Sequence, residues 1–408
     1  MRKGKRIMNR VHLFSAGRGD ESTRSDCRVE LEVKTTGGIQ LTLESKVSSM
    51  YGRSIRRQVL EACHMLGLRH AAIRIVDQGA LPFVLAARLE AAVKRALPEV
   101  SAEVLPEPAV RRHDRSQKER HRRTRLYLPG NEPKFLPNAA LHRPDAVVLD
   151  LEDSVAPNEK DAARALVRNA LRGVDFGDAE VMVRINQGRI GLDDLRAVVP
   201  HGPDCIVIPK CEDQEAVKLV ESEVLAIERD VKSRRSILLL PIIESALGVV
   251  HAFAIASASS RVCALAIGLE DYTADIGVER TPEGRESLFA RASVVNAAKA
   301  AGVQALDSVF SDVDDLEGLR RSTLEARSLG FEGKGCIHPR QIPVVHAAFA
   351  PTAQEIERAK QIIAASEEAE RSGSGVVALG SKMIDPPVVR RAERILRLVK
   401  DLEKEGDR

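Results

Sequence analysis

Eight short apolar runs separated by helical segments constrain the fold of this chain most strongly. Most of the runs are continuous rather than alternating, which is typical of parallel strands buried on both faces. The intervening segments have helical periodicity, for example residues 159–172, 213–229 and 287–301. The runs are RLYLP (from residue 125), AVVLD (146), VMVRIN (181), CIVIPK (205), ILLLPIIE (237), CALAIG (263), VQALDSV (303) and GKGCIHP (333). Eight strand–helix units over about 280 residues predict a (β/α)8 barrel.

A doubly wound parallel sheet is the alternative architecture for such a pattern. It is less favoured because nearly every run ends in a polar or charged residue. In addition, no glycine-rich phosphate-binding motif follows the first run.

The N-terminal part of the chain has a different pattern, which predicts a small α/β domain. Residues 28–34 and 39–44 alternate in polarity around TTGG and predict a β-hairpin. Residues 71–76 resemble a third strand, and residues 54–66 and 80–97 have helical spacing.

A charge-dense segment, EPAVRRHDRSQKERHRRTR at residues 107–125, separates the two patterns. We interpret it as a solvated linker rather than a nucleic-acid patch, because Asp114 and Glu119 interrupt the basic residues and aromatic residues are scarce. The predicted organisation is therefore a small domain over residues 10–100, a charged linker over 101–122 and a barrel with a C-terminal lid over 123–408.

Composition excludes several classes of protein. The net charge of +3 is small for 408 residues, and aromatic residues make up 3%, so nucleic-acid binding is not expected. No apolar run is long enough for a membrane span, and none follows the basic N-terminus as in a signal peptide. The six cysteines are scattered without a CxxC pair, which favours reduced thiols and a cytoplasmic location.

Charged and polar residues that suit catalysis or metal binding follow the predicted strands. Active sites of barrels lie at the carboxyl ends of strands. Glu244 and Asp271 are 27 residues apart, one strand–helix–strand step, so they are expected to be neighbours. Carboxylates this close repel one another unless a cation such as Mg²⁺ lies between them. Arg184 has the planar fork that holds a carboxylate. The other strand-end residues are Asp150, Glu152, Asp153, Asn186, Lys210, Glu270, Asp307, Ser308 and His338.

Structural roles for the same residues remain open at this point. Asp150, Glu152 or Asp153 would also suit the first turn of the following helix, and Glu244 would suit the cap of the helix that begins at SALG. Arg184 would also suit a structural ion pair with Asp150 or Asp153.

Several motifs resemble the beta subunit of citrate lyase and the wider malyl-CoA and citryl-CoA lyase family (HpcH/HpaI aldolase/citrate lyase). The resemblance covers residues 123–399 and rests on RTRLYLPGNEPKFLPNA, DAVVLDLEDSVAPNEKDAAR, VRIN, VIPKCED, IIESALG, AIGLEDYTADIGVERTPEG, GFEGKGCIHPRQI and GSKMIDPPVV. It implies a barrel of the phosphoenolpyruvate-binding type that uses Mg²⁺ to cleave a C–C bond beside a thioester.

The resemblance also implies roles for individual residues. Glu244 of IIES and Asp271 of LEDY correspond to metal ligands, with Glu244 also at the substrate. Arg184 of VRIN corresponds to the clamp for the substrate carboxylate, and Asp385 of KMID to a catalytic acid/base on a C-terminal lid of a neighbouring subunit. We expect Asp150, Glu152 and Asp153 to form a supporting acidic layer that orders metal-bound water and Arg184. A lid shared between subunits implies a homo-oligomer, a trimer or hexamer.

The N-terminal domain resembles the gamma subunit of citrate lyase, its acyl carrier protein, over residues 22–95. LESKVSSMYGRSIRRQVL and VDQGALPFVLAARLEAA carry this resemblance. In that family a serine bears a CoA-derived prosthetic arm, but Arg24 stands at its place here, flanked by Ser22 and Ser25. Either Ser25 carries the arm after a local shift, or the domain carries none.

The expected activity is cleavage of a citryl thioester, carrier-bound or CoA-bound, to oxaloacetate and an acetyl thioester, by an oxo-acid-lyase. One alternative is a lyase for free malyl-CoA or β-methylmalyl-CoA with a degenerate N-terminal domain. The other is a non-catalytic scaffold. The expected partners are an acyl thioester substrate and either further copies of the chain or a citrate lyase complex with a transferase subunit.

Overall fold

The computed structural model describes residues 12–109, 116–233, 236–371, 377–379 and 382–406, and these form two compact units. The first unit is Met1–Val345 and the second is His346–Arg408. The predicted domain start at residue 10 and the middle of the predicted linker lie outside the described residues. Among the described helices, none combines the length and the apolar character that crossing a bilayer requires.

The N-terminal sheet contains four strands in the order β1–β2–β4–β3. Its elements are β1 (Phe14–Ala16), β2 (Cys27–Val33), β3 (Ile39–Ser45), α1 (Ser48–Met65), β4 (Ala71–Asp77) and α2 (Pro82–Ala96). The predicted hairpin is wrong, because β4 lies between β2 and β3, antiparallel to the first and parallel to the second. The TTGG segment passes the start of β4 instead, where the N–H of Gly38 donates to Nδ1 of His70 and the N–H of Lys34 donates to its carbonyl.

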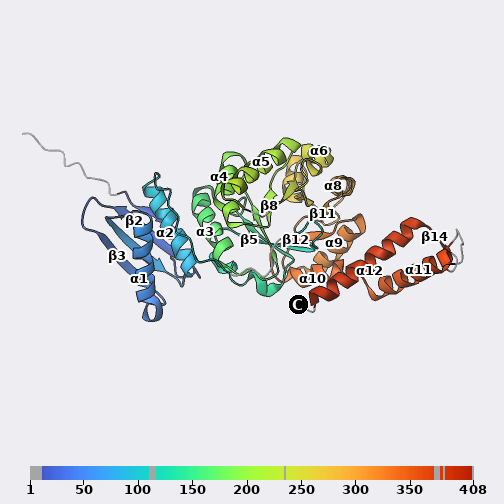
Figure 1. Ribbon diagram of the computed structural model, residues 1–408, viewed down its shortest axis with the longest axis horizontal. Helices are drawn as coiled ribbons and strands as arrows, with labels where there is room; N and C mark the ends of the chain where they lie inside the picture. Colours follow the sequence, from blue (N-terminus) through green and yellow to red (C-terminus); the bar gives the residue numbers. More distant parts are fainter. Residues whose placement is uncertain (1–11, 110–115, 234–235, 372–376, 380–381, 407–408) are drawn as a thin grey trace, which may run out of the picture. The chain divides into compact units, whose positions relative to one another are not determined.

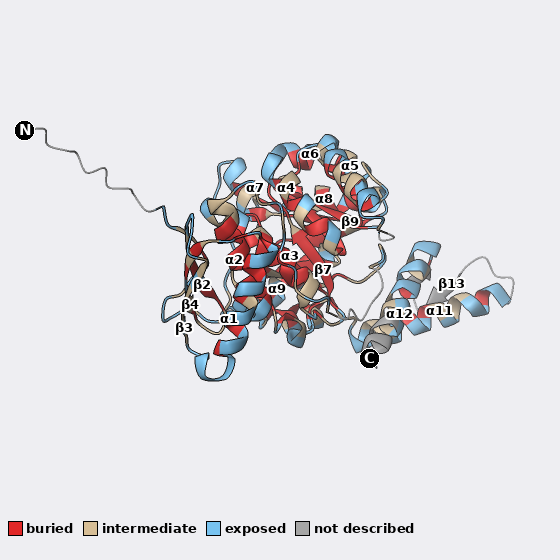
Figure 2. Ribbon diagram, turned by 60° about the vertical axis from the view of Figure 1, so that its left-hand side comes forward, coloured by how far each residue is buried: buried red, intermediate tan, exposed pale blue. Residues whose placement is uncertain are grey.

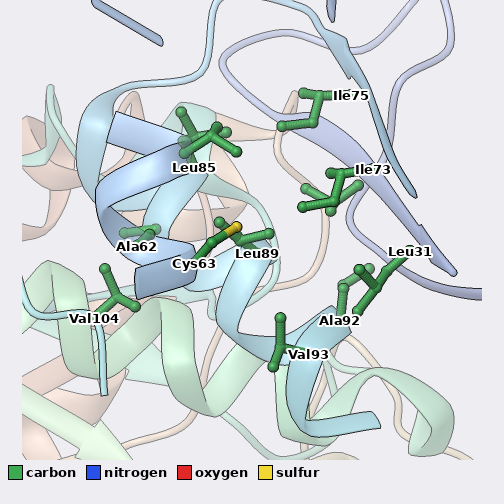
Figure 3. Close-up of a cluster of buried hydrophobic side chains, with 14 of the residues drawn as sticks. Leu31, Ala62, Cys63, Ile73, Ile75, Leu85, Leu89, Ala92, Val93 and Val104 are labelled. Atoms are coloured by element: carbon green, nitrogen blue, oxygen red, sulfur yellow. The ribbon is translucent and has the colours of Figure 1, made fainter. Parts of the chain in front are cut away.

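Helices α1 and α2 supply one side of the N-terminal core. Leu31, Ile73 and Ile75 of the sheet lie in one buried cluster with Ala62 and Cys63 of α1 and with α2 (Figure 3). The cluster also includes Ala162, which comes from the barrel rather than from this domain.

The eight apolar runs form a closed parallel barrel, as predicted (Figure 1). Each strand pairs with its sequence neighbours, and the last pairs with the first. The strands are β5 (Thr124–Pro129), β6 (Ala146–Asp150), β7 (Glu180–Arg184), β8 (Cys205–Ile208), β9 (Leu238–Ile243), β10 (Ala264–Ile267), β11 (Gln304–Asp307) and β12 (Gly333–Cys336). Because the strands run parallel, their carboxyl ends gather at one mouth.

Strands such as β6, β8 and β9 are buried from end to end, whereas the helices around the barrel have exposed and buried faces (Figure 2). Continuous apolar strands meet helices outside and packed side chains inside. The helices are α3 (Lys160–Gly173), α4 (Gly188–Val198), α5 (Gln214–Asp230), α6 (Ala246–Ala256), α7 (Leu269–Asp275), α8 (Leu288–Ala300), α9 (Leu316–Leu329) and α10 (Gln341–Phe349). The short 3-10 turns are η1 (Pro133–Phe135), η2 (Ala139–His142), η3 (Pro157–Glu159) and η4 (Val199–His201).

Parts of the predicted linker contact the barrel, although several of its described residues are exposed. At its end, Arg122 is fully buried beneath the strands and makes two hydrogen bonds to Glu180, at 2.7 and 2.8 Å. Near its start, the N–H of Ala109 donates to the carbonyl of Arg172 on α3, at 2.7 Å. The charge density that suggested a solvated segment therefore includes buried ion pairs, which sequence composition does not distinguish from exposed charge.

The second unit contains the long helices α11 (Ala353–Arg371) and α12 (Pro386–Gly406), with strands β13 (Val377–Leu379) and β14 (Lys382–Ile384) between them. The two strands pair antiparallel. Ala359 and Ile362 of α11 pack against Ile384 and Ala392 in a small separate core.

Candidate active site

Asp150, the last residue of β6, and Arg184, the last residue of β7, are register partners and form a bidentate ion pair. Arg184 donates from Nε and Nη2 to the two Asp150 oxygens, each at 2.7 Å. The Asp150 oxygens also accept the N–H groups of Glu152 and Ser154, at 2.9 and 3.3 Å. Asp150 therefore acts as a structural anchor that fixes the turn after β6 and the orientation of Arg184.

Arg184 is held from several directions, with its side chain 13% exposed. Its Nη1 lies 3.1 Å from Glu152 Oε2 and 3.6 Å from Asp153 Oδ2, and its guanidinium lies 5.6 Å from the centre of the Tyr127 ring. Burial opposes its charge, but hydrogen bonding and the charge of Asp150 outweigh that effect and raise its pKa. Asp150 occupies the Nε–Nη2 edge of the guanidinium, so a substrate carboxylate would meet the remaining N–H groups of Nη1 and Nη2 on a permanently charged, pre-oriented cation.

Lys210 connects the acids of three strands. Its backbone N–H donates to Glu244 Oε1 at 2.6 Å, with φ at +47°, an uncommon backbone conformation for a lysine. Its ammonium donates to Glu152 Oε1 at 2.7 Å and to Asp153 Oδ1 at 3.2 Å, and lies 4.0 Å from Asp271 Oδ1. The sequence places Lys210 at a strand end, but nothing local in VIPKCED signals which acids it contacts.

Glu244 follows β9 and is 5% exposed. Ser245, not Glu244, caps α6 by accepting the N–H of Gly248, so the capping alternative for Glu244 is wrong. Burial raises the pKa of Glu244 to about 7, and the charges of Asp271 and Glu152 add to the effect. The carboxylate lies against Gly268, where an added Cβ would stand 2.4 Å from Glu244 Oε2.

Asp271 lies in the first turn of α7 with its side chain 45% exposed. Together with Glu244, Asp150, Glu152 and Asp153, it makes five carboxylates at this mouth. They outnumber three nearby cations, which are Arg184, Lys210 and Lys160. Burial raises the pKa of Glu152, as expected where neighbouring carboxylates crowd together. The mouth thus has an excess of negative charge that a further cation would relieve.

The donor set fits Mg²⁺. Hard carboxylate oxygens suit this ion, which usually takes one or two carboxylates and keeps water or substrate in its other positions. Within the residues that the structure describes, no three His, Cys, Asp or Glu side chains converge as a ready-made metal cage. Glu244 and Asp271 remain the candidates for direct ligands.

Other strand-end residues have local partners. Asp307 is fully buried and pairs with Lys334 and Arg291, at 2.6 and 3.2 Å. Glu270 pairs with Arg280, and Asn186 donates to Asp194 Oδ2 at 2.7 Å. These contacts stabilise the barrel wall.

Asp385 belongs to the second compact unit, where it is exposed. Its Oδ1 accepts the N–H of Val388 at 3.3 Å, at the start of α12. Its catalytic role stays a prediction that rests on the KMID motif.

The predicted attachment turn of the N-terminal domain precedes β2. Ser25 is half-buried with φ at +58°, and its N–H donates to the carbonyl of Gln78 at 3.2 Å. Ser22 and Arg24 are exposed. Asp26 is buried and accepts two hydrogen bonds from Arg88, each at 2.9 Å.

Comparison with known families identifies the chain. Residues 123–339 match the HpcH/HpaI aldolase/citrate lyase family, and the chain belongs to this family. Residues 21–96 match an acyl carrier family described as the malonate decarboxylase delta subunit (MdcD). The predictions of a barrel lyase and of a carrier-like N-terminal domain are therefore confirmed.

Individual relatives show which enzymes of the family the chain is similar to. The citrate lyase beta subunit of Leuconostoc mesenteroides subsp. cremoris is 44% identical over 287 residues, which cover 69% of this chain and 94% of that protein. The mitochondrial citramalyl-CoA lyase of Mus musculus is 34% identical over 295 residues, covering 69% and 87%. The solved structure of CitE from Mycobacterium tuberculosis, in complex with magnesium, acetoacetate and coenzyme A, is 31% identical with a TM-score of 0.57, covering 69% and 99%.

Proposed function

We propose that the chain is a Mg²⁺-dependent lyase that cleaves a citryl thioester to oxaloacetate and an acetyl thioester. The observation that carries the proposal is the mouth itself, where a fixed arginine fork faces an acidic cluster with unbalanced negative charge. The similarity to citrate lyase beta subunits, and the magnesium and coenzyme A in the CitE structure, support the choice of metal and substrate class.

Each candidate residue has a defined part in this reaction. Arg184 binds a carboxylate of the part that leaves as oxaloacetate, and Asp150 keeps the guanidinium in place. Glu244 and Asp271 would hold Mg²⁺, which when bound supplies Lewis-acid stabilisation of negative charge on the substrate oxygens. Glu152 and Asp153 order Arg184 and Lys210 through the contacts described above.

The proposed reaction is a retro-aldol cleavage. The substrate hydroxyl loses its proton to a base at the mouth, and the C–O bond becomes the carbonyl of oxaloacetate. The electrons of the broken C–C bond pass to the α-carbon of the acetyl thioester as an enolate. Asp385, by analogy on the lid of a neighbouring subunit in a homo-oligomer, donates the proton that completes the methyl group.

A second candidate is a lyase for free acyl-CoA substrates such as malyl-CoA, with an N-terminal domain that bears no prosthetic arm. Arg24 at the expected serine position and the similarity to citramalyl-CoA lyase favour it. Intact-mass measurement of protein from its native host distinguishes the two, because an arm on Ser25 or Ser22 would contradict the second candidate.

A product assay tests the proposed reaction. Purified protein is given citryl-CoA or malyl-CoA with Mg²⁺, and oxaloacetate and glyoxylate are measured separately. We expect oxaloacetate from citryl-CoA. Glyoxylate from malyl-CoA without oxaloacetate from citryl-CoA would replace the proposal with the second candidate.

A further inference from the structure

Helix α2 of the N-terminal domain is buried on all sides. Every residue from Phe83 to Val93 is buried, although a surface helix normally has one polar, exposed face. One side of α2 packs in the core of its own domain, and the other packs against α3 of the barrel. Ala162 of α3 belongs to that same core. The two domains therefore share apolar packing at this contact.

A buried ion pair crosses this contact. Arg168 of α3 donates from Nη1 and Nη2 to the two oxygens of Glu90 on α2, at 2.8 and 2.7 Å, with side chains 2% and 1% exposed. Glu90 Oε2 also accepts the N–H of Val104 at 2.7 Å, and the Asn169 amide donates to the carbonyls of Phe83 and Val104, at 3.2 and 3.1 Å. Separation of the domains would break this pair and expose its apolar surroundings to water.

Two further contacts hold the ends of the interface. Arg95, in the last turn of α2, forms a bidentate pair with Asp161 at the start of α3, at 2.6 and 2.7 Å. Arg88, which holds Asp26, donates to the carbonyl of Asn131 at 3.0 Å. Asp26 directly follows Ser25, so this arginine connects the predicted attachment turn to the barrel.

The attachment turn is fixed on the mouth side of the barrel. Asn131 lies two residues after the end of β5, and the N–H of the preceding Gly130 donates to the carbonyl of Asp150 at 2.8 Å. A continuous series of contacts therefore runs from Asp26 through Arg88 and residues 130–131 to the anchor of Arg184.

We propose that the N-terminal domain is a fixed part of the lyase, docked on α3 of its own barrel, and does not work as a carrier that leaves to visit a second active site. The inference deepens the proposed function, on which it rests for the nature of the thioester. The thioester that the barrel cleaves is then a free molecule of the CoA class or a group attached at the chain's own turn. On this proposal, the chain's own N-terminal domain does not undock from α3 to serve the active site of another subunit.

Permanent docking sets an upper limit on the Kd between the two domains. Two domains joined within one chain by a short connection meet at an effective concentration of about 1 mM. If the separated domains bind with a Kd of about 1 μM or below, the domain in the intact chain is undocked about one part in a thousand of the time.

Proteolytic cleavage between the N-terminal domain and the barrel of the folded protein tests the proposal. A protease site is inserted between Ala109 and Ser116, the full-length protein is purified and cut, and the fragments are analysed by size-exclusion chromatography over a dilution series. We expect the fragments to co-elute down to about 1 μM. Separation of the unsubstituted fragments at tens of micromolar or above would overturn the proposal, and this result needs no variant to fold.

Matched variants identify the contacts responsible. In cut protein, Glu90→Ala is expected to raise the Kd at least tenfold, because it removes the bidentate partner of Arg168 and leaves that buried guanidinium only Glu103 and Asn169. Arg74→Met, which removes an exposed pairing with Glu30 and Glu44 on the same domain, is the control and should leave the Kd unchanged. Equal Kd values for Glu90→Ala and the control would also contradict the proposal. Because chromatography does not depend on catalysis, failure here is distinguishable from failure to find oxaloacetate.

Discussion

The pKa of Glu244 predicts how Mg²⁺ binding depends on pH. Burial, with the charges of Asp271 and Glu152, raises this pKa to about 7 in the metal-free protein. A carboxylate must be ionised to bind Mg²⁺, so protonation competes with the metal. With a pKa of 7 the ionised fraction falls from about 0.9 at pH 8 to about 0.03 at pH 5.5. The Kd for Mg²⁺ should therefore rise about 30-fold, or about 2 kcal/mol, over this interval.

The same shift affects the stability of the metal-free protein. Well below pH 4.5, the ordinary pKa of a glutamate, the carboxyl is neutral in both the folded and the unfolded chain and does not change the free energy of unfolding. As the pH rises from about 4.5 to 7, the unfolded chain ionises first, so the free energy of unfolding falls, by about 3 kcal/mol in total. Mg²⁺ should reverse that loss above pH 7, because it binds the ionised carboxylate of the folded state.

Isothermal titration calorimetry of Mg²⁺ into EDTA-treated protein at pH 5.5, 6.5, 7.2 and 8 provides the assay. Glu244→Gln should abolish the site, and Glu270→Gln, which changes the exposed acid paired with Arg280, is the matched control. A Kd that stays constant within twofold from pH 5.5 to 8, as for a carboxyl with an ordinary pKa near 4.3, would refute the reasoning.

Three further perturbations test Lys210, Gly268 and Asp385. Lys210→Met should tighten Mg²⁺ binding about tenfold in calorimetry, because the ammonium competes for the same acids; weaker binding would contradict this. Gly268→Ala should abolish cleavage with an unchanged circular dichroism spectrum, since its Cβ would displace Glu244, and full activity would contradict that contact. Mixing inactive Asp385→Asn and Glu244→Gln proteins after joint unfolding and refolding should restore part of the activity if the acid comes from a neighbouring subunit, and no recovery would place it elsewhere.

The barrel was predictable because each strand carries its signal locally. Runs such as AVVLD and CIVIPK are apolar at every position, and parallel burial is the environment that such runs fit. The predicted hairpin is wrong for the opposite reason. The turn signal at TTGG shows that the chain bends, but it does not show that β4 enters between β2 and β3.

The mouth was predictable in part. Strand order alone places Arg184 beside Asp150 and Glu244 near Asp271. The position of Lys210 depends on a backbone conformation with φ at +47° and on acids from three strands, none of which the local sequence encodes. The docking of α2 is also nonlocal, because Glu90 and Arg168 have the appearance of ordinary surface charges until the two helices meet.

The rate of oxaloacetate formation from citryl-CoA, measured in EDTA and again after addition of Mg²⁺, tests the central claim most directly. The account predicts that cleavage stops in EDTA and returns with Mg²⁺ in the unsubstituted protein. It also predicts that Glu244→Gln remains inactive in both conditions, while Glu270→Gln behaves like the unsubstituted protein. Unchanged oxaloacetate formation in EDTA, or an active Glu244→Gln enzyme, would contradict it.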